Sequence, residues 1–335
     1  MKKKYWFTLF AIISMLFLTA CGSDDNTGRT NETENGNETT ETYKIGASQF
    51  VEHPSLDAAY EGFQAAIADA GLDVEYDLQS AQADQNNTGT IAQNFVADDV
   101  DLIFANATPS AQAALQATRE IPIVFTSVTD AVGSGLVDAM DQPGDNITGV
   151  MDMHPDAIIE TIAFIEEYFA GVNIGVVYNA GESNSVTQIE HVEAAIEGTS
   201  LSLTERTVST SAEVQQAATS LVGDADVIMI ITDNTVVSAL ESVISVANEQ
   251  QIPLFVGEPD SLERGGFATF GIDYYTIGYR AGEMAVEILT GAKAPSDIHV
   301  EYPPEMQLFI NRDAAEKQGV EWNSTWDDIA SFIEE

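Results

Sequence analysis

The amino-acid sequence predicts an α/β protein built from two doubly wound, mainly parallel sheets joined by a multi-crossover hinge. From about residue 43 to residue 310, short runs rich in β-branched and aromatic residues alternate with segments of helical periodicity. Strand, helix and strand at this spacing are typical of βαβ units and hence of a parallel sheet. Ten strand candidates exceed one comfortable sheet, so we expect two sets that divide near residues 147–155.

The strand candidates are short, apolar runs bounded by turn residues. They are Lys44–Ala47, Val74–Leu78, Leu102–Ala105, Ile123–Thr126, Ile147–Val150, Ile174–Tyr178, Leu201–Val208, Val227–Ile231, Leu254–Val256 and Ala268–Gly271. The helical candidates between them carry apolar residues at steps of three and four. They are Leu56–Ala70, Thr90–Ala97, Ser110–Thr118, Asp156–Phe169, Val186–Glu197, Ala212–Leu221, Val236–Gln250 and Tyr274–Thr290.

The first strand and helix illustrate the repeated unit. A strand over 44–47 leads into a polar loop, and Pro54 then suits the first turn of a helix because its φ angle is fixed. Ligands of open α/β sheets bind where a loop leaves the carboxyl end of a strand. The N–H groups and the dipole of the following helix favour an anion there, such as a carboxylate. We expect the repeated corners to face one another across a cleft.

The predicted chain crosses between the two lobes more than once. The helix over 274–290 follows the second set of strands and ends at Gly291, a residue typical of helix ends. The predicted lobes are 43–148 plus 272–294 and 149–271 plus 295–335, and the predicted hinge pieces are 149–152, 271–273 and 294–298. Two independent βαβ domains on a simple linker would have the same strand count.

The N-terminal residues 1–20 have the features of an export signal. Three lysines precede an apolar run over 5–18 that is too short to span a membrane comfortably. Leu18-Thr19-Ala20-Cys21 resembles a bacterial lipobox, which implies cleavage before Cys21 and lipidation of its thiol. The alternative is an ordinary signal peptide followed by a free cysteine. Residues 21–42 are polar and acidic, so we expect a disordered tether between the anchor and the folded part.

The formal net charge of −42 restricts the partners of the protein. A nucleic-acid partner requires a basic surface, and an anionic lipid surface would repel this chain beyond the anchor itself. Solubility outside the cell, in concentrated salt or at high pH, accounts for the charge. Metal binding by acidic loops is the alternative interpretation.

Catalytic and cofactor motifs are absent from the sequence. Gly133-Ser134-Gly135 lacks the spacing of a Gly-x-Ser-x-Gly elbow, and the four histidines show no metal-ligand spacing. Neither a Gly-x-Gly-x-x-Gly run nor a Walker sequence occurs. We therefore expect a binding protein without a cofactor or metal rather than an enzyme.

Hydroxyl and amide side chains follow most of the predicted strands. The loops that carry them are 48–53, 106–110, 126–130, 179–185, 232–235 and 257–260. Such side chains are also the preferred N-caps of helices, so each residue could simply begin a helix. Six such loops on two facing sheets nevertheless favour a ligand site, because one corner can supply both caps and ligand contacts.

Individual loop residues suggest roles in that site. Phe50 follows a strand and is either a contact at the rim or an aromatic wall for the ligand. The carboxylates suited to a ligand ammonium, or else to helix capping, are those of Asp233, Glu258 and Asp273. The side chains and helix-start amides suited to a carboxylate are those of Thr108, Ser110 and Ser127.

Gln49–Asp57, with its His-Pro-Ser-Leu-Asp core, resembles the signature of a family of bacterial ABC-transporter substrate-binding lipoproteins, some of which carry tryptophan or other aromatic amino acids. Further matches are Ala107–Gln112, Thr129-Asp130, Asn146–Val150, Asn184-Ser185 and Asp233–Thr235, and together they span about 44–311. The resemblance implies a type I periplasmic-binding-protein fold, no catalysis and a ligand trapped between lobes. It also implies delivery to a membrane permease that a separate ATPase powers.

From the loops and the resemblance we expect a monomeric receptor for an aromatic amino acid, anchored outside the cell membrane. Its expected ligand-binding residues are Gln49, Phe50, His53, Leu56, Thr108, Ser110, Ser127, Asn184, Ser185, Asp233, Asn234, Glu258 and Asp273. Glu258-Pro259-Asp260 and the pair Tyr274-Tyr275 depart from the family pattern and leave another amine-bearing solute open. Receptors for a sugar, a nucleoside or a signalling molecule, and a sensor without transport, are the alternatives.

Overall fold

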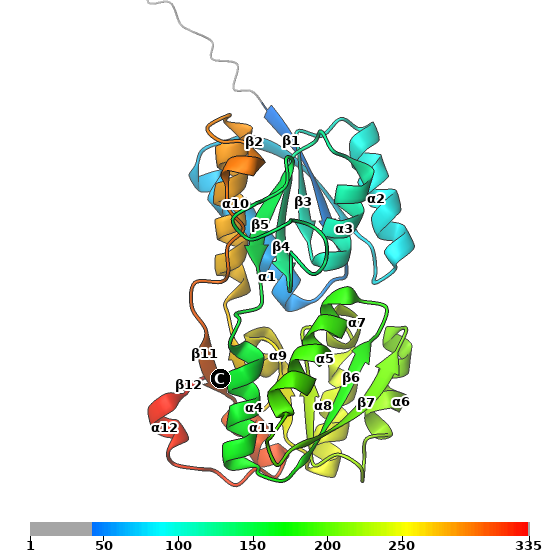
Figure 1. The fold of residues 1–335 in the computed structure, drawn as a ribbon, viewed down its shortest axis with the longest axis vertical. Helices are drawn as coiled ribbons and strands as arrows, with labels where there is room; N and C mark the ends of the chain where they lie inside the picture. The colour runs from blue at the N-terminus through cyan, green and yellow to red at the C-terminus, as the bar shows by residue number, and fades with distance from the viewer. Residues whose placement is uncertain (1–41, 334–335) are drawn as a thin grey trace, which may run out of the picture. The chain divides into compact units, whose positions relative to one another are not determined.

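A computed structural model describes residues 42–333 of the chain (Figure 1). The predicted signal peptide, the predicted lipidation site Cys21 and nearly all of the predicted tether lie outside the described residues. The first strand begins at Thr42, the last residue that we assigned to the tether.

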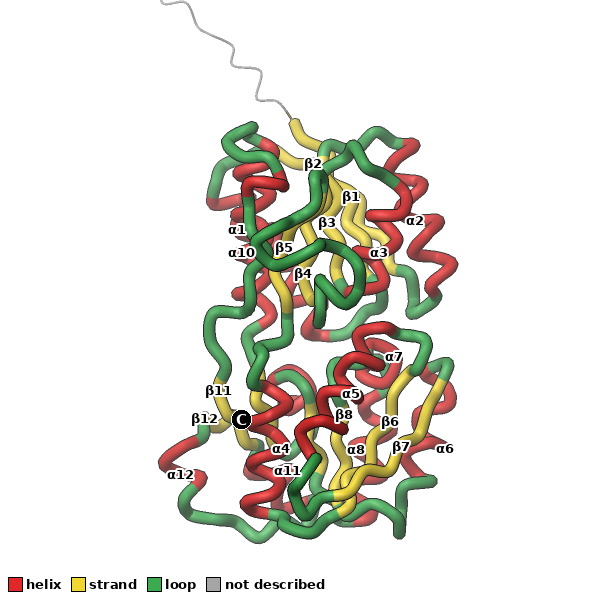
Figure 2. The backbone as a smooth tube through the Cα atoms, viewed as in Figure 1, coloured by secondary structure: helices red, strands yellow, loops and turns green. Residues whose placement is uncertain are grey.

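The first lobe is built around a five-stranded parallel sheet of order β2-β1-β3-β4-β5. Its strands are β1 Thr42–Gln49, β2 Asp73–Ser80, β3 Leu102–Asn106, β4 Ile123–Val128 and β5 Ile147–Met151. Helices α1 Pro54–Asp69 and α10 Tyr274–Leu289 pack on one face. Helices α2 Gln85–Ala97 and α3 Thr108–Ala117 pack on the other (Figure 2).

The second lobe surrounds a seven-stranded sheet of order β12-β11-β10-β9-β8-β6-β7, in which only β10 and β11 pair antiparallel. Its strands are β6 Asn173–Asn179, β7 Ser202–Val208, β8 Val227–Ile230, β9 Leu254–Val256, β10 Ala268–Gly271, β11 Gln307–Ile310 and β12 Ser331–Phe332. Its helices are α4 Ala157–Tyr168, α5 Ser183–Ile196, α6 Val214–Thr219, α7 Asn234–Val237, α8 Leu240–Gln250, α9 Pro259–Arg264, α11 Arg312–Lys317 and α12 Trp326–Ile329. Short 3₁₀ turns occupy Ser211–Glu213 and Pro295–Asp297. The predicted α/β class with two doubly wound sheets is confirmed.

The two lobes repeat one strand order. β2-β1-β3-β4-β5 in the first lobe corresponds to β7-β6-β8-β9-β10 in the second. The order reverses between β1 and β3, and again between β6 and β8. At such a reversal, the loops at the carboxyl ends of the strands diverge and leave a crevice for a ligand. Each lobe therefore presents one crevice.

Helix α10 belongs to the first lobe although it follows strands of the second. A Cβ atom added to Gly278 would lie 1.9 Å from Ala59 O, and one added to Gly62 would lie 2.1 Å from Tyr275 O. Glycine at these positions lets the backbones of α1 and α10 approach more closely than any side chain permits.

The third crossover differs from the predicted one. Residues 295–301, which we assigned to the second lobe, lie against the first lobe beside β5. Ile298 and Val300 are buried in its apolar clusters, and the Glu301 N–H donates to Gly149 O at 3.1 Å. Because these apolar residues complete the first lobe, the chain crosses after residue 301. Strand β5 also continues to Met151 on the first sheet, past the boundary predicted at residue 148.

One helix was predicted longer than it is. The segment 236–250 is divided, because Ala239 leaves the helical conformation between α7 and α8. Arg264 Nη1 donates to Val237 O at 2.9 Å and so satisfies a carbonyl exposed by the break. Neither glycine nor proline occurs at this position, so the break in the helix could not be predicted from the local sequence.

None of the described helices is long and apolar enough to cross a membrane.

Candidate ligand-binding site

A small cavity, with a volume of about 10 Å³ open to water-sized spheres, lies between the carboxyl ends of the two sheets. Its wall is formed by His53, Leu56, Ser127, Thr129, Asp152, Asn184, Thr232, Asn234, Val237, Glu258 and Tyr274. Because these residues come from both lobes, a solute held there would contact both lobes at once.

Five of these side chains carry a buried polar atom without a hydrogen-bond partner. The atoms are His53 Nδ1, Ser127 Oγ, Asp152 Oδ1, Asn184 Oδ1 and Glu258 Oε2. Leaving a buried polar group unpaired costs about 1–3 kcal/mol, so native proteins keep few of them. Their concentration around one cavity indicates a site for a polar ligand.

The side chain of Glu258 lies at this wall, and only one of its two carboxyl oxygens accepts hydrogen bonds from the protein. Its Oε1 accepts from Ser55 Oγ of the first lobe at 3.2 Å and from Ser261 Oγ, whereas Oε2 is unpaired. Burial raises the pKa of Glu258 to about 7. A ligand ammonium at Oε2 would satisfy this oxygen and favour the ionised carboxylate.

Asp152 is a second buried carboxyl at the wall, at the crossover that follows β5. Its Oδ2 accepts from the Tyr274 hydroxyl at 2.8 Å, and Oδ1 is unpaired. Burial raises the pKa of Asp152 to about 6. From the sequence we expected Asp152 only in the hinge, and Tyr274 only as a departure from a family pattern. Asp152 therefore lies both at a crossover and at the cavity, beside Tyr274 at the start of α10.

The N-terminus of α1, which is the positive end of its helix dipole, lies at the same cavity. Its N-cap residue His53 makes no side-chain hydrogen bond to the first turn, and Pro54 occupies the first helical position. Burial lowers the pKa of His53 to about 4, so its ring is neutral at pH 7. The N–H groups of Ser55 and Leu56 therefore have no capping side chain, which favours a ligand carboxylate at this end.

The backbone is strained where the first lobe meets the cavity. Ser127 has φ 58° and sits in a register shift between Phe125 and Val128 of β4. Ala107, just before α3, has φ 92°. Such conformations are costly for residues other than glycine and cluster at functional sites. The shift in β4 directs Ser127 to the cavity wall.

A buried carboxylate supports the opposite wall from behind. Glu182 is fully buried and accepts from the backbone N–H groups of Asn234 and Thr235 at 3.2 and 3.0 Å. It also accepts from their side chains, at 2.6 Å from Asn234 Nδ2 and 2.7 Å from Thr235 Oγ1. These four bonds fix the start of α7 and place Asn234 at the cavity.

Asp233 is the cap of α7 and does not line the cavity. Its carboxylate accepts from the N–H of Val236 at 2.8 Å, the N–H of Asn179 at 2.6 Å and Ser185 Oγ at 2.7 Å. Burial and the nearby charge of Glu182 raise the pKa of Asp233 to about 7. The carboxylate of Asp233 is thus largely hydrogen-bonded within the second lobe. Ser185 lies beside Asp233, behind the cavity wall.

Two further predicted residues organise the first lobe instead of lining the cavity. Gln49 Nε2 donates to Asp57 Oδ1 at 2.7 Å, and Gln49 Oε1 accepts from Asn106 Nδ2 at 3.3 Å. Ser110 Oγ accepts from Ser48 Oγ at 3.2 Å. These bonds connect the ends of β1 and β3 to α1 and α3.

Three other predicted residues also lie outside the cavity wall. Thr108 is buried at the start of α3 with its hydroxyl unpaired. Asp273 is the exposed N-cap of α10 and accepts from the Thr276 N–H at 2.9 Å. Phe50 is only 1% exposed; it packs in an apolar cluster of the first lobe and borders a crevice between the lobes.

The predicted residues that do line the cavity are His53, Leu56, Ser127, Asn184, Asn234 and Glu258. The wall residues that the sequence analysis did not propose as ligand contacts are Thr129, Asp152, Thr232, Val237 and Tyr274. Within residues 42–333, no group of three or more His, Cys, Asp or Glu side chains is arranged to hold a metal ion.

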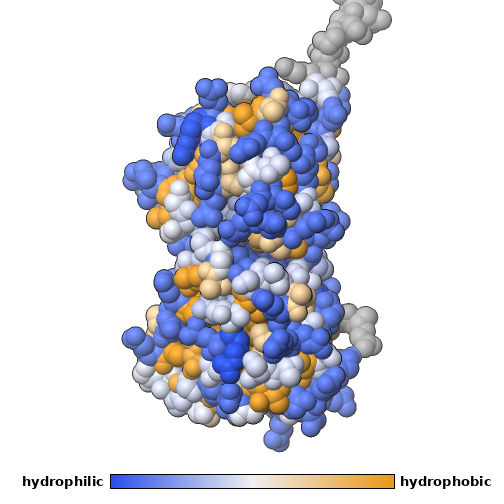
Figure 3. All heavy atoms as spheres, turned by 90° about the vertical axis from the view of Figure 1, so that its right-hand side faces the viewer, coloured by the Kyte–Doolittle hydropathy of each residue, from blue (hydrophilic) through white to orange (hydrophobic). Residues whose placement is uncertain are grey.

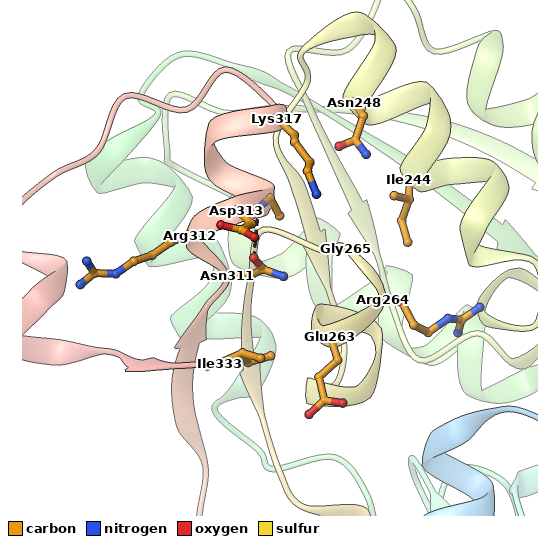
Figure 4. A pocket seen from close by; sticks show the side chains of 11 residues that line it. Ile244, Asn248, Glu263, Arg264, Gly265, Asn311, Arg312, Asp313, Lys317 and Ile333 are labelled. Carbon is orange, nitrogen blue, oxygen red and sulfur yellow. Dashed lines mark hydrogen bonds between the residues drawn. The ribbon is translucent and has the colours of Figure 1, made fainter. Parts of the chain in front are cut away.

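A separate hollow of about 460 Å³ lies between α8 and α11 of the second lobe (Figure 4). Arg264 there forms a two-point ion pair with Glu241 at 2.8 Å, and Arg312 points away and stacks over Trp322. None of the residues lining this hollow carries a buried unpaired polar atom. It therefore lacks the feature that distinguishes the cavity between the lobes.

The chain matches a family model described as ABC transporter substrate binding protein over residues 44–329. It is 41% identical over 320 residues to a Tyrosine-binding protein of Clostridioides difficile (strain R20291), covering 93% of this chain and 91% of that protein. The structure of an ABC domain in complex with L-Trp from Streptococcus pneumonia is 31% identical, with a TM-score of 0.83, and the match covers 88% of this chain and all of that chain. A ligand-free, open structure of a substrate binding protein with adhesive properties from Clostridium difficile is 37% identical, with a TM-score of 0.64, and the match covers 87% of this chain and 99% of that chain.

Proposed function

Because the chain belongs to the ABC transporter substrate binding protein family and has the type I periplasmic-binding-protein fold, we propose that it captures a free aromatic amino acid outside the cytoplasmic membrane. The observation that carries this proposal is the cavity between the lobes with its five unpaired polar atoms. In this proposal the ligand ammonium binds Glu258 and Asp152. The ligand carboxylate binds the start of α1 and the hydroxyl of Ser127.

The contacts between the lobes support capture by closure. Besides the bond from Ser55 to Glu258, Gln85 Nε2 of the first lobe donates to Gly181 O of the second at 2.6 Å. The TM-score to the L-Trp complex is 0.83, whereas it is 0.64 to the open, ligand-free structure of higher sequence identity. We infer that the described arrangement is the closed one, and that a ligand touching both lobes favours it through its differential affinity.

Transport and attachment complete the proposal. The closed, loaded form is delivered to a membrane permease that a separate ATPase powers. A lipid on Cys21 and the acidic segment 21–42 keep the monomeric receptor close to the outer surface of the membrane. The chemistry of the cavity and the ligands of the relatives favour an amino acid over a sugar, because the wall offers two carboxyls for an ammonium group.

Thermal unfolding with candidate ligands tests the proposed function. Tyrosine, tryptophan or phenylalanine should raise Tm, because a ligand that binds only the folded state stabilises it by mass action. At a ligand concentration 100 times Kd the stabilisation is about 2.7 kcal/mol. The remaining amino acids, glucose and adenosine serve as comparisons. A rise with glucose or adenosine and none with any aromatic amino acid would overturn the proposal.

A further inference from the structure

Glu182 does not line the cavity, yet it is bonded to a helix that does. It is the N-cap residue of α5, but its side chain makes no capping bond to α5. The carboxylate instead accepts from the N–H groups and the side chains of Asn234 and Thr235, the first two residues of α7. Helix α7 has only four residues, and so short a helix is not stable by itself. The start of α7 therefore depends on Glu182.

The loop that ends at this glutamate also carries a contact between the lobes. Gly181 O accepts from Gln85 Nε2 of the first lobe at 2.6 Å. The loop is tied to α7 a second time, because Asn179 Nδ2 donates to Thr235 Oγ1 at 3.0 Å. The loop over 179–182 and the start of α7 thus form one hydrogen-bonded unit, with the contact to the first lobe at one end and the cavity wall at the other.

We propose that Glu182 is a positioning residue that couples the bound ligand to closure of the lobes. This inference rests on the proposed function, in which the ligand lies between the two lobes. A ligand that packs against Asn234 holds α7 in place, and α7 holds the carboxylate of Glu182. The carboxylate keeps Gly181 within reach of Gln85. Coupling is reciprocal, so the contact at Gly181 also favours the arrangement of α7 that binds the ligand.

Thr235→Val tests the coupling without removing a buried charge. The substitution deletes one donor to Glu182, which lies at 2.7 Å, and preserves the size of the side chain. The affinity for tyrosine should fall about 2–10-fold, as expected for the loss of one hydrogen bond. Thr235→Ser keeps the hydroxyl group and should restore the affinity to that of the wild type.

The dissociation rate of tyrosine distinguishes coupling from a merely structural role. Gln85→Ala should raise this rate in the wild-type protein, because it removes the contact between the lobes. In Thr235→Val the same substitution should raise the rate less, and in Glu182→Gln it should have no further effect, because the loop no longer holds Gly181 in place. Two independent effects would instead multiply.

Glu166→Gln is the matched control for Glu182→Gln. Glu166 also accepts from a backbone N–H and a hydroxyl group, those of Ser200 at 3.1 and 2.9 Å, but it lies on α4 and does not line the cavity. Gln85→Ala should raise the dissociation rate as much in this background as in the wild type. If Glu182→Gln does not fold, the two Thr235 variants decide the question.

The outcomes separate the two proposals. If tyrosine binds, but Gln85→Ala leaves the wild-type rate unchanged or raises the rate equally in every background, Glu182 does not couple the cavity to closure and the proposed function stands. If no aromatic amino acid binds the wild-type protein, the proposed function fails and this inference fails with it.

Discussion

At the scale of single residues, Glu258 should control both the strength and the pH dependence of ligand binding. Its unpaired Oε2 lies at the cavity wall, and burial raises its pKa to about 7. Glu258→Gln should weaken tyrosine binding by about 2–5 kcal/mol, the usual cost of removing one partner of a buried charge pair. Isothermal titration calorimetry measures this loss.

The pH dependence of this binding follows from the direction of the pKa shifts. An ammonium group favours the ionised carboxylate, whereas below pH 7 the unliganded Glu258 is mostly protonated. Affinity should therefore rise as the pH increases from 6 to 8, and binding near pH 6 should release protons to the buffer. Asp152, whose pKa is about 6, should add to the decrease at the acidic end.

Glu263→Gln is the matched control for this prediction. Glu263 lies on the same short helix, α9, but is exposed and outside the cavity. Its variant should keep both the affinity and the pH dependence of the wild type. Wild-type affinity and pH dependence in Glu258→Gln would refute a role for Glu258 in binding the ammonium.

Residues of the cavity wall could be predicted from the sequence where a strand, a loop and the start of a helix follow one another directly. His53 and Glu258 were found in this way. Asp233 and Asp273 satisfy the same pattern yet cap helices, because the pattern does not distinguish a side chain turned to its own helix from one turned to the cavity. Asp152 could not be found, because its role depends on Tyr274, which is 122 residues later in the chain.

At the scale of elements, the contact between α1 and α10 should tolerate no side chain at Gly278. A Cβ atom there would lie 1.9 Å from Ala59 O, which belongs to helix backbone and cannot move alone. Gly278→Ala should lower the free energy of unfolding by about 1–3 kcal/mol through overpacking. Urea denaturation measures the change.

Gly89→Ala provides a control of opposite sign. Gly89 lies inside α2, and a Cβ atom there would meet no atom within 4 Å. Alanine should stabilise this helix by about 0.5–1 kcal/mol because it lowers the entropy lost on folding. If both variants changed stability in the same direction, close packing at Gly278 would not be the cause.

Elements with a strong local pattern were predicted closely, and elements that depend on distant partners were not. The strand β9 and the helix α10 match their predicted ranges to within a residue. By contrast, β12 has two residues and exists through its pairing with β11, and α12 has only four. Their short patterns carry too few residues for a periodicity to emerge.

At the scale of the whole folded part, the predicted pair of doubly wound sheets is confirmed. The order of the strands within each sheet, however, could not be predicted from the sequence. Pairing such as that of β1 with β3 joins residues 57 positions apart, and no local sequence pattern predicts it.

The formal charge of −42 agrees with the hydrophilic side chains that cover much of the face shown in Figure 3. Such a surface favours solubility and repels other acidic surfaces.

Closure of the two lobes leads to a prediction for the lifetime of the complex. Gln85 Nε2 donates to Gly181 O across the lobes at 2.6 Å, and neither residue lines the ligand cavity. A hydrogen bond of this kind contributes about 0.5–1.5 kcal/mol net. Gln85→Ala should therefore destabilise the closed state and raise the dissociation rate of tyrosine about 2–10-fold, with little change in the association rate.

Stopped-flow kinetics and small-angle scattering check this prediction together. Gln64→Ala removes a similar glutamine bond, to Tyr60 OH at 3.1 Å, but within α1 alone, so its dissociation rate should equal that of the wild type. The unliganded Gln85→Ala protein should also have a larger radius of gyration, because more of it occupies the open arrangement. Equal dissociation rates for the two variants would show that the bond between Gln85 and Gly181 does not hold the closed lobes together. The lifetime of the complex would then depend on contacts through the ligand and on the bond from Ser55 to Glu258.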